Sequence, residues 1–226
     1  RNYDYGTSRH IVKSPSSATA TWGVQGSEKG ILYINGSNSG FIPLEVNINR
    51  ANVTNSAGSQ TITYAGSSIN LPNLNSLFSV DANAGTRTYT IESGGTGTGS
   101  ISGSTLIVTK AGTFRIGLTT AATDTHNAGT KVIGTLTVNK GSQAAPTGLS
   151  AVDATGDSLS DGKIAGLDAD KLYEYKESTD TAYTTVAANS TEITGLGQGT
   201  YLVRLRANDL YNAGTDASVT VGVTKA

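Results

Sequence analysis

Alternation of apolar and polar residues marks several short segments of the chain. In "GTFRIGLT" (112–119), Phe114, Ile116 and Leu118 alternate with smaller or polar residues. The same period occurs in "KVIGTLTVNK" (131–140), "GTYLVRLRA" (199–207) and "SVTVGV" (218–223). A period of two residues predicts a strand with one buried face. No segment shows sustained helical periodicity with capping residues, so the chain is predicted to be all-β.

Two long segments of the chain align with each other. Residues 104–141 match residues 190–226, and the phrase Asn-Ala-Gly-Thr at 127–130 returns at 212–215. A period of about 86 residues suits one β-sandwich module. Each copy is therefore predicted to end in the same hairpin, with one alternating strand before the phrase and another after it.

The repeated phrase is interpreted as turn chemistry and not as a ligand-binding loop. Gly129 and Gly214 can adopt the positive φ that tight turns demand, and Asn127 and Asn212 can hydrogen-bond their own backbone. The residue before the phrase changes from histidine to tyrosine between the copies. If this residue bound the same ligand in both copies, we would expect the same residue type in both.

A weaker repeat lies upstream, and it divides the chain into three predicted modules. "YDYGTSRHIV" (3–12) resembles "ITYAGSSINL" (62–71), with Tyr5 opposite Tyr64. Glycine, serine and proline in "NKGSQAAPTGLS" (139–150) indicate a linker. The predicted modules are a short β module at 1–52, trimmed or packed on the next one, and sandwiches at 53–141 and 145–226.

The third module resembles fibronectin type III or immunoglobulin-like repeats of Gram-positive cell-surface proteins. The resemblance rests on "APTGLSAV" (145–152), "DGKIAGL" (161–167), "LYEYKESTDTAYTTV" (172–186) and "TEITGLGQGTYLVRLRAND" (191–209). It implies tandem β-sandwiches, with Tyr201 as a tyrosine corner that bonds nearby backbone and Ile164 in place of an early tryptophan. The second module resembles bacterial immunoglobulin-like (Big-type) domains through "QTITYAGSSINL", "GTFRIGLTT" and "GTLTV".

Composition narrows the classes of partner and location. Charged residues make up only 15% of the chain, with 16 Lys and Arg against 17 Asp and Glu. No basic stripe exists to bind phosphates, so nucleic acid is not expected as a partner. No apolar run is long enough for a membrane span. The start at "RNYDYG" and the lack of methionine suggest a fragment of a longer protein, and we expect a monomer that is extracellular, at a bacterial cell surface or cell wall.

Few residues offer catalytic chemistry. The absence of cysteine excludes a disulfide framework, a thiolate metal site and a cysteine nucleophile. The histidines are His10 and His126, and Asp124 lies in the same predicted turn as His126, where a triad is hard to assemble. The glycine-rich segment 92–103 lacks the Gly-Lys-Ser/Thr ending of a phosphate-binding loop. We expect no enzyme activity, no catalytic residue and no cofactor.

The densest acidic group could bind calcium or could form a solvated turn. Asp153, Asp157 and Asp161 lie close together, but their spacing matches no EF-hand loop, so they are weak metal candidates. An isopeptide crosslink is a further open question, with candidate lysines at Lys13, Lys110 and Lys163.

Aromatic side chains are the weak candidates for ligand contact. Trp22 is the single tryptophan, and Tyr173 and Tyr175 share one face of a predicted strand, as core residues or as a sugar-binding platform. A sandwich must fill its inner faces, which favours the core.

Two functions from different classes follow from these features. The first is a non-catalytic structural or interaction region of a secreted or wall-anchored bacterial surface protein, acting as stalk or adhesin, with a host or matrix protein or a glycan as unidentified partner. The second is an accessory, glycan-binding region of a large secreted carbohydrate-active enzyme. Exposed stacking aromatics would favour the second, and buried ones the first.

Overall fold

The chain is built from β-strands, as the alternating pattern predicts. The computed structural model describes residues 2–4, 10–12, 26–33, 41–66 and 73–224, with side chains from residue 49 onward. In these ranges the helical structure is one short 3-10 turn, η1 (Leu74–Leu77). No helix in this described part is long and apolar enough to cross a membrane.

The first strands form two antiparallel pairs. β1 (Asn2–Asp4) pairs with β2 (His10–Val12), and β3 (Gly26–Tyr33) pairs with β4 (Phe41–Ile48). Trp22 and Tyr5 lie outside the described residues.

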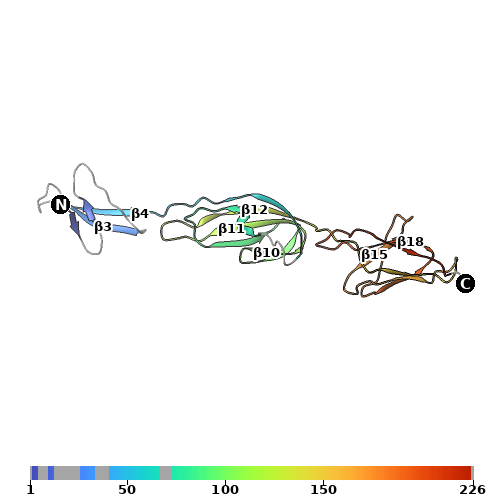
Figure 1. Ribbon diagram of the computed structural model, residues 1–226. Helices are drawn as coiled ribbons and strands as arrows, with labels where there is room; N and C mark the ends of the chain where they lie inside the picture. The colour runs from blue at the N-terminus through green and yellow to red at the C-terminus, as the bar shows by residue number, and fades with distance from the viewer. Residues whose placement is uncertain (1, 5–9, 13–25, 34–40, 67–72, 225–226) are drawn as a thin grey trace. The chain divides into compact units, whose positions relative to one another are not determined.

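The central strands contain the first long alternating segments. They are β5 (Ser56–Ala57), β6 (Ser59–Thr63), β7 (Phe78–Ser79), β8 (Arg87–Glu92), β9 (Thr98–Ser102), β10 (Thr105–Lys110), β11 (Gly112–Thr120) and β12 (Gly129–Asn139). The largest sheet has the order β6-β12-β11-β8, β9 pairs with β10, and β5 pairs with β7. β11 and β12 run side by side in Figure 1. Phe114, Ile116 and Leu118 are at most 1% exposed, which confirms the predicted inner face of β11.

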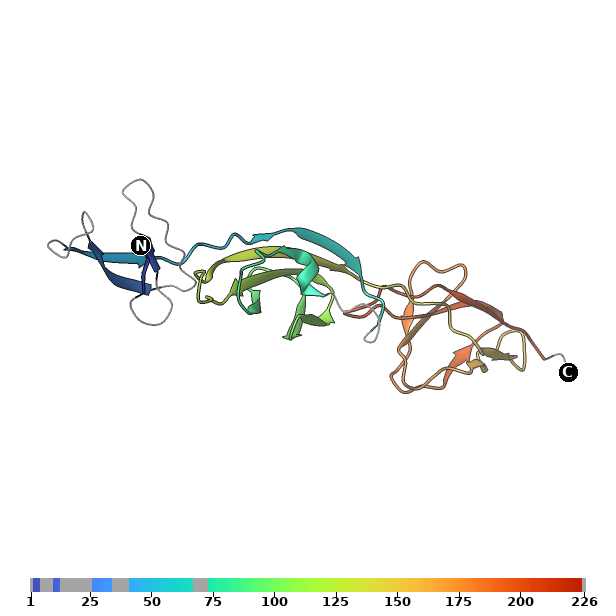
Figure 2. The same ribbon diagram turned by 60° about the vertical axis from the view of Figure 1, so that its left-hand side comes forward.

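The last strands form a two-layered sandwich. They are β13 (Ser150–Val152), β14 (Gly162–Ala165), β15 (Tyr173–Glu177), β16 (Thr184–Thr185), β17 (Glu192–Leu196), β18 (Gly199–Leu205) and β19 (Ala217–Val221). One sheet has the order β13-β14-β17 and the other β16-β15-β18-β19. These strands lie in the yellow-to-red part of the chain in Figures 1 and 2. Seven short strands in two antiparallel sheets are typical of an immunoglobulin-like sandwich.

A single apolar cluster fills the space between these two sheets. It includes Ile164, Val203 and Val221, each 0% exposed. Ile164 therefore occupies the core, as the resemblance implied. The Tyr201 hydroxyl donates a hydrogen bond to the Gly197 carbonyl at 3.1 Å, which confirms the predicted bond to nearby backbone.

The chain divides into two compact units, and their borders differ from those of the predicted modules. The first unit comprises Arg1–Gly58, Phe78–Thr90 and Gly117–Gly134. The second comprises Ser59–Leu77, Ile91–Ile116 and Thr135–Ala226. This division cuts through β11 and β12 and therefore does not test the predicted module borders at 52 and 145. Those borders stay predictions.

Candidate functional site: two loop–linker joints

The repeated Asn-Ala-Gly-Thr phrase lies where a loop meets a linker. In the second copy the loop is 208–215 and the linker is 139–143, and we call this contact the second joint. The Gly141 N–H donates to the Leu210 carbonyl at 2.9 Å, and the Asn212 N–H donates to the Gly141 carbonyl at 2.8 Å. These bonds make a short parallel bridge between Gly141 and Tyr211. The Asn212 side-chain amide also approaches the Lys140 carbonyl, at 3.5 Å.

The first copy makes the same contact with a different linker. Here the loop is 123–130 and the linker is 49–52, and we call this contact the first joint. The Ala51 N–H donates to the Thr125 carbonyl at 3.0 Å, and the Asn127 N–H donates to the Ala51 carbonyl at 2.8 Å. The Asn127 side-chain amide donates to the Arg50 carbonyl at 3.3 Å and to Asn52 Oδ1 at 3.0 Å. Both joints therefore use equivalent backbone and asparagine groups.

Each loop is also closed by hydrogen bonds between its own residues, separate from those that it makes to the linker. The Thr123 N–H donates to the His126 carbonyl at 2.9 Å, and the Asn208 N–H donates to the Tyr211 carbonyl at 3.0 Å. The reverse bonds use side chains: the His126 N–H donates to Thr123 Oγ1, and the Tyr211 N–H donates to Asn208 Oδ1. The loop presents a preformed backbone edge, so little ordering entropy is lost when it contacts the linker.

The predicted chemistry of the phrase was wrong in two respects. Gly129 and Gly214 do not have positive φ. A Cβ on Gly129 would lie 2.3 Å from both the Asn55 amide nitrogen and Thr120 Oγ1, so a larger residue there would have to displace these two hydrogen-bonded side chains. The asparagine side chains bond the linker and not their own backbone. The predicted hairpin itself is confirmed for the second copy, because β18 pairs with β19 on either side of the loop.

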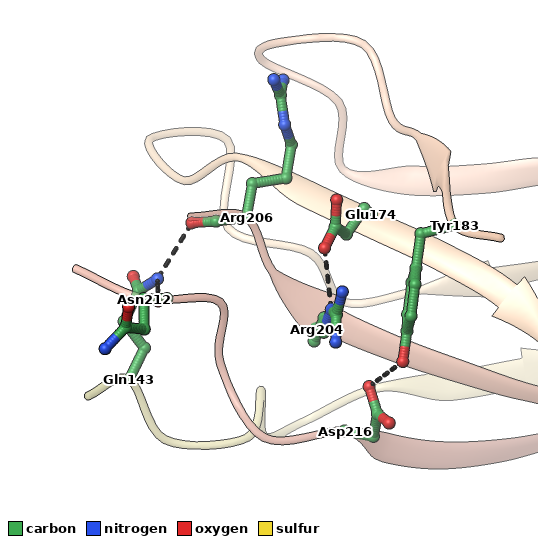
Figure 3. A network of polar contacts seen from close by, with 7 residues as sticks. All are labelled: Gln143, Glu174, Tyr183, Arg204, Arg206, Asn212 and Asp216. Atoms are coloured by element: carbon green, nitrogen blue, oxygen red, sulfur yellow. Dashed lines mark hydrogen bonds and ion pairs between the residues drawn. The ribbon is translucent and has the colours of Figure 1, made fainter. Parts of the chain in front are cut away.

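A glutamine side chain extends the second joint. Gln143 Nε2 donates to the Arg206 carbonyl at 2.9 Å and to the Asn212 carbonyl at 2.7 Å, as Figure 3 shows. The Thr215 N–H donates to the Gln143 carbonyl at 3.1 Å. The Ala111 N–H donates to the Asp209 carbonyl at 2.9 Å, so the turn after β10 also meets this loop.

Two tyrosines cover Gly141. The rings of Tyr64 and Tyr211 have centroids 5.2 Å apart and planes at 77°. Gly141 is buried. A Cβ at this position would lie 2.4 Å from the Tyr64 carbonyl oxygen and 2.9 Å from two Tyr211 ring carbons. Glycine is thus the residue that lets the linker pass close to the Tyr64 carbonyl and the Tyr211 ring.

The acidic candidates are held by separate partners. Asp153 Oδ1 accepts the Gly222 N–H at 2.8 Å. Asp161 accepts the Thr155 hydroxyl and N–H, and these bonds, the hydroxyl first, hold the pKa of Asp161 below its usual value. Asp157 is exposed. Within the described ranges, no three His, Asp or Glu side chains are grouped as a metal site.

The aromatic candidates divide between the core and the undescribed part of the chain. Tyr173 is 4% exposed and its hydroxyl accepts the Asp168 N–H at 3.2 Å. Tyr175 packs partly buried against the same core, with its ring centroid 6.3 Å from that of Tyr201. Tyr173 is therefore a core residue and no platform. The position of Trp22 lies outside the described residues.

The two histidines differ in what the structure describes. His126 Nδ1 lies 2.9 Å from the Thr125 hydroxyl, and the backbone of His126 bridges to Ala51. His126 is thus part of the first joint. His10 lies in β2, where only the backbone is described. Among the lysine candidates, Lys163 forms an ion pair with Glu192 at 2.9 Å, Lys110 is exposed, and Lys13 lies outside the described residues.

A polar cluster on the β15–β18 surface was not predicted from the sequence. Arg204 Nε donates to Glu174 Oε1 at 2.7 Å, and the guanidinium carbon lies 3.5 Å from the centroid of the Tyr183 ring. The Tyr183 hydroxyl donates to Asp216 Oδ1 at 2.7 Å (Figure 3). Desolvation, followed by the Asp216 carboxylate, raises the pKa of Tyr183 above its usual value. The cluster attaches the β15–β16 connection to β18 and β19.

Comparisons with known proteins add little to this architecture. No protein-family model matches the sequence, and no curated protein matches it. Among solved structures, the FN1-FN3 domains of chicken CNTN1 are similar to this chain at 11% sequence identity, over 86% of this chain and 74% of that one, with a TM-score of 0.26. At that TM-score the likeness supports no conclusion beyond the sheets described above.

Proposed function

We propose that this chain is a non-catalytic structural and interaction region of a secreted or wall-anchored bacterial surface protein, where it serves as a stalk or an adhesin. Its β-sandwiches act as spacers, and the joints limit their movement about the linkers. The resemblance of residues 145–226 to repeats of Gram-positive surface proteins supports the extracellular location.

The observation that carries the proposal is the recurrence of one joint at two places in the chain. A flexible linker needs no specific contact with the following loop. Here both linkers exchange two backbone hydrogen bonds with a loop, and an asparagine amide reaches the preceding carbonyl. Backbone groups that pair with each other at a linker restrict its dihedral angles and so restrict bending. Restricted bending is what a stalk needs.

The aromatic residues support the stalk over the glycan-binding alternative. Tyr173 lies in the core and Tyr175 packs partly buried against it, which favours a packing role for these two rings. Exposed aromatic rings are the usual platform for such stacking. The alternative then depends on Trp22.

The stiffness of the second joint can be measured directly, because the chain has no cysteine of its own. Spin labels at Ser102→Cys and Ser218→Cys, both exposed positions, would report distances across the joint. We expect a narrow distance distribution by pulsed electron resonance. Gln143→Ala combined with Asn212→Ala should broaden it, while Gln198→Ala, at an exposed position, should not. A distribution as broad in the parent chain as in the double variant would refute the spacer role.

A glycan array separates the two functional classes. We expect no specific signal from this chain. Specific binding that is lost on Trp22→Ala would replace the stalk by the glycan-binding alternative. Binding that survives the substitution would keep the stalk but make a glycan the adhesin's ligand.

A further inference from the structure

The chain enters and leaves the last sandwich along two segments that run in the same direction. The entry segment, 141–154, makes a parallel bridge near each of its ends with the exit segment, 211–224. One bridge lies in the second joint, and the other joins Ala154 to Val223. The second joint is therefore one end of a longer contact between the two segments, which we call the seam.

Hydrogen bonds close the far end of the seam. Asp153 Oδ1 accepts the Gly222 N–H at 2.8 Å. The Ala154 N–H donates to the Gly222 carbonyl at 3.0 Å, and the Thr224 N–H donates to the Ala154 carbonyl at 2.8 Å. Ala154 is 0% exposed, so water has little access to its two backbone bonds. These bonds connect the segment after β13 to the end of β19, and both strands lie at the edges of their sheets.

Parallel segments at the start and the end of a sandwich respond to tension in a particular way. Tension along the chain pulls the entry segment toward residue 141 and the exit segment toward residue 224. Because the segments are parallel, these forces slide one segment past the other, and the bonds at both ends of the seam carry the load together. A load applied at one end of the pair would break the bonds one after another. Forced unfolding is limited by the rate of the opening step, so the sliding geometry resists tension better.

The central sheet has the same geometry with a longer contact. β6 pairs in parallel with the end of β12 over five consecutive pairs, which start with Ser59 opposite Thr135. The Tyr64 N–H adds a bond to the Asn139 carbonyl at 2.9 Å. The seam has separate bridges near its two ends in place of such a continuous ladder. The last sandwich is therefore held against tension less firmly than the β6–β12 pair.

We propose that the seam is a force-bearing clamp, and that under tension the last sandwich opens before the β6–β12 pair does. The inference rests on the proposed function, because a stalk or adhesin at a cell surface is pulled along its length. Opening of the last sandwich lengthens the chain while the central sheet stays closed. The chain thus absorbs a strong pull by a reversible extension at one place.

The direction of pulling tests the clamp on one set of hydrogen bonds. Thr147→Cys with Thr224→Cys places optical-tweezers handles at opposite ends of the far bridge. Asp157→Cys with Thr224→Cys places them at the same end. All three positions are exposed, and the chain has no cysteine of its own. At one loading rate, we expect the first pair of handles to need at least about twofold more force to open the last sandwich. Equal forces overturn the clamp.

A side-chain substitution tests the seam without a change in pulling direction. Asp153→Ala removes the carboxylate that accepts the Gly222 N–H. With handles at Thr147→Cys and Thr224→Cys, the opening rate at constant force should rise at least about threefold, because hydrogen bonds to charged groups are the stronger ones. Asp157→Ala removes another exposed carboxylate and is the matched control, which should leave the rate unchanged. Equal rates in the two variants overturn the seam as the force-bearing contact.

The order of opening needs handles that load both contacts in series. Thr54 is exposed and precedes β6, so Thr54→Cys with Thr224→Cys includes the β6–β12 pair and the seam in one pull. We expect two openings, with Asp153→Ala accelerating the one at lower force and leaving the other unchanged. Acceleration of the higher-force opening instead would show that the proposed order is wrong.

The outcome for the clamp is distinguishable from the outcome for the proposed function. Bending about the second joint is measured by the spin-label distances, and resistance to tension by the opening force. Equal forces in the two pulling directions, together with a narrow distance distribution, overturn the clamp and leave the stalk in place. A broad distribution in the parent chain overturns the stalk, whatever the opening forces are.

Discussion

The Tyr211 ring meets the Tyr64 ring edge to face, with centroids 5.2 Å apart. Tyr64 directly follows β6, and Tyr211 belongs to the loop between β18 and β19. The pair therefore connects two segments of the sequence that are far apart, and the Tyr211 ring also lies close to the linker residue Gly141. The contact between the two rings therefore stabilises the second joint and not either sheet alone.

Removing either ring should loosen the second joint. Edge-to-face aromatic pairs contribute about 0.5–1.5 kcal/mol beyond the area that they bury. We expect Tyr64→Ala and Tyr211→Ala to lower the free energy of unfolding, and the double variant to lose less than the sum of the two. Urea unfolding of the four proteins in a double-mutant cycle measures the coupling. Additive losses would show that the rings do not interact in solution.

Tyr201→Phe should lower stability and flatten its alkaline pH dependence. The variant loses the 3.1 Å hydrogen bond to Gly197, worth about 0.5–1.5 kcal/mol. Burial, and then the Glu177 carboxylate, raise the pKa of Tyr201 above 10.0. A raised pKa favours the neutral folded form, so this stability is present below pH about 10 and is lost as pH rises through the folded pKa. Unfolding at neutral and alkaline pH compares the slopes, and equal slopes would contradict the assignment.

Asp161→Asn should reduce the acid sensitivity of the last sandwich. The Thr155 hydroxyl and N–H lower the pKa of Asp161 below 3.8. The charged carboxylate therefore adds stability above that value, and the contribution is lost as pH falls through the folded pKa. Thermal unfolding from neutral pH down to about pH 3 should show a shallower decline in the variant. Asp157→Asn is the control, because Asp157 is a neighbouring exposed carboxylate. A shallower decline in Asp157→Asn but not in Asp161→Asn would show that Asp157, and not Asp161, causes the acid sensitivity.

Arg204→Lys should destabilise the last sandwich more than the loss of an exposed ion pair. Arg204 and Glu174 are directly paired across β15 and β18, and their side chains are 27% and 19% exposed. Lysine keeps the charge but loses the planar stacking on Tyr183, which we expect to cost about 0.5–1 kcal/mol. Lys171→Ala removes an exposed pair with Asp168, where the side chains are 55% and 49% exposed, and is the comparison. Equal losses on chemical unfolding would mean that the stacking adds nothing.

The strands could be predicted from the sequence because their signal is local. A residue and its neighbour two positions away share a face whatever the rest of the chain does. For that reason Phe114, Ile116 and Leu118 were assigned correctly to a buried face. The tyrosine corner is also local, because Tyr201 bonds a carbonyl only four residues upstream.

The joints and the Arg204 cluster could not be predicted in the same way. Asn127 meets Arg50, which lies 77 residues away in the sequence, and most of the bonds use backbone groups that leave no trace in residue type. Glu174 and Arg204 meet through a strand register that no local pattern specifies. One weak signal was available: the linker sequences "INRA" and "VNKG" each contain a β-branched residue, an asparagine, a cation and a small residue in that order, although only the asparagine is identical.

Each linker is joined to a loop from the repeat that follows it. A tandem duplication of one whole repeat would therefore add one linker and one loop together, and every existing contact would keep a partner. Unequal crossing-over between gene copies could then lengthen or shorten the protein without leaving a joint half-made.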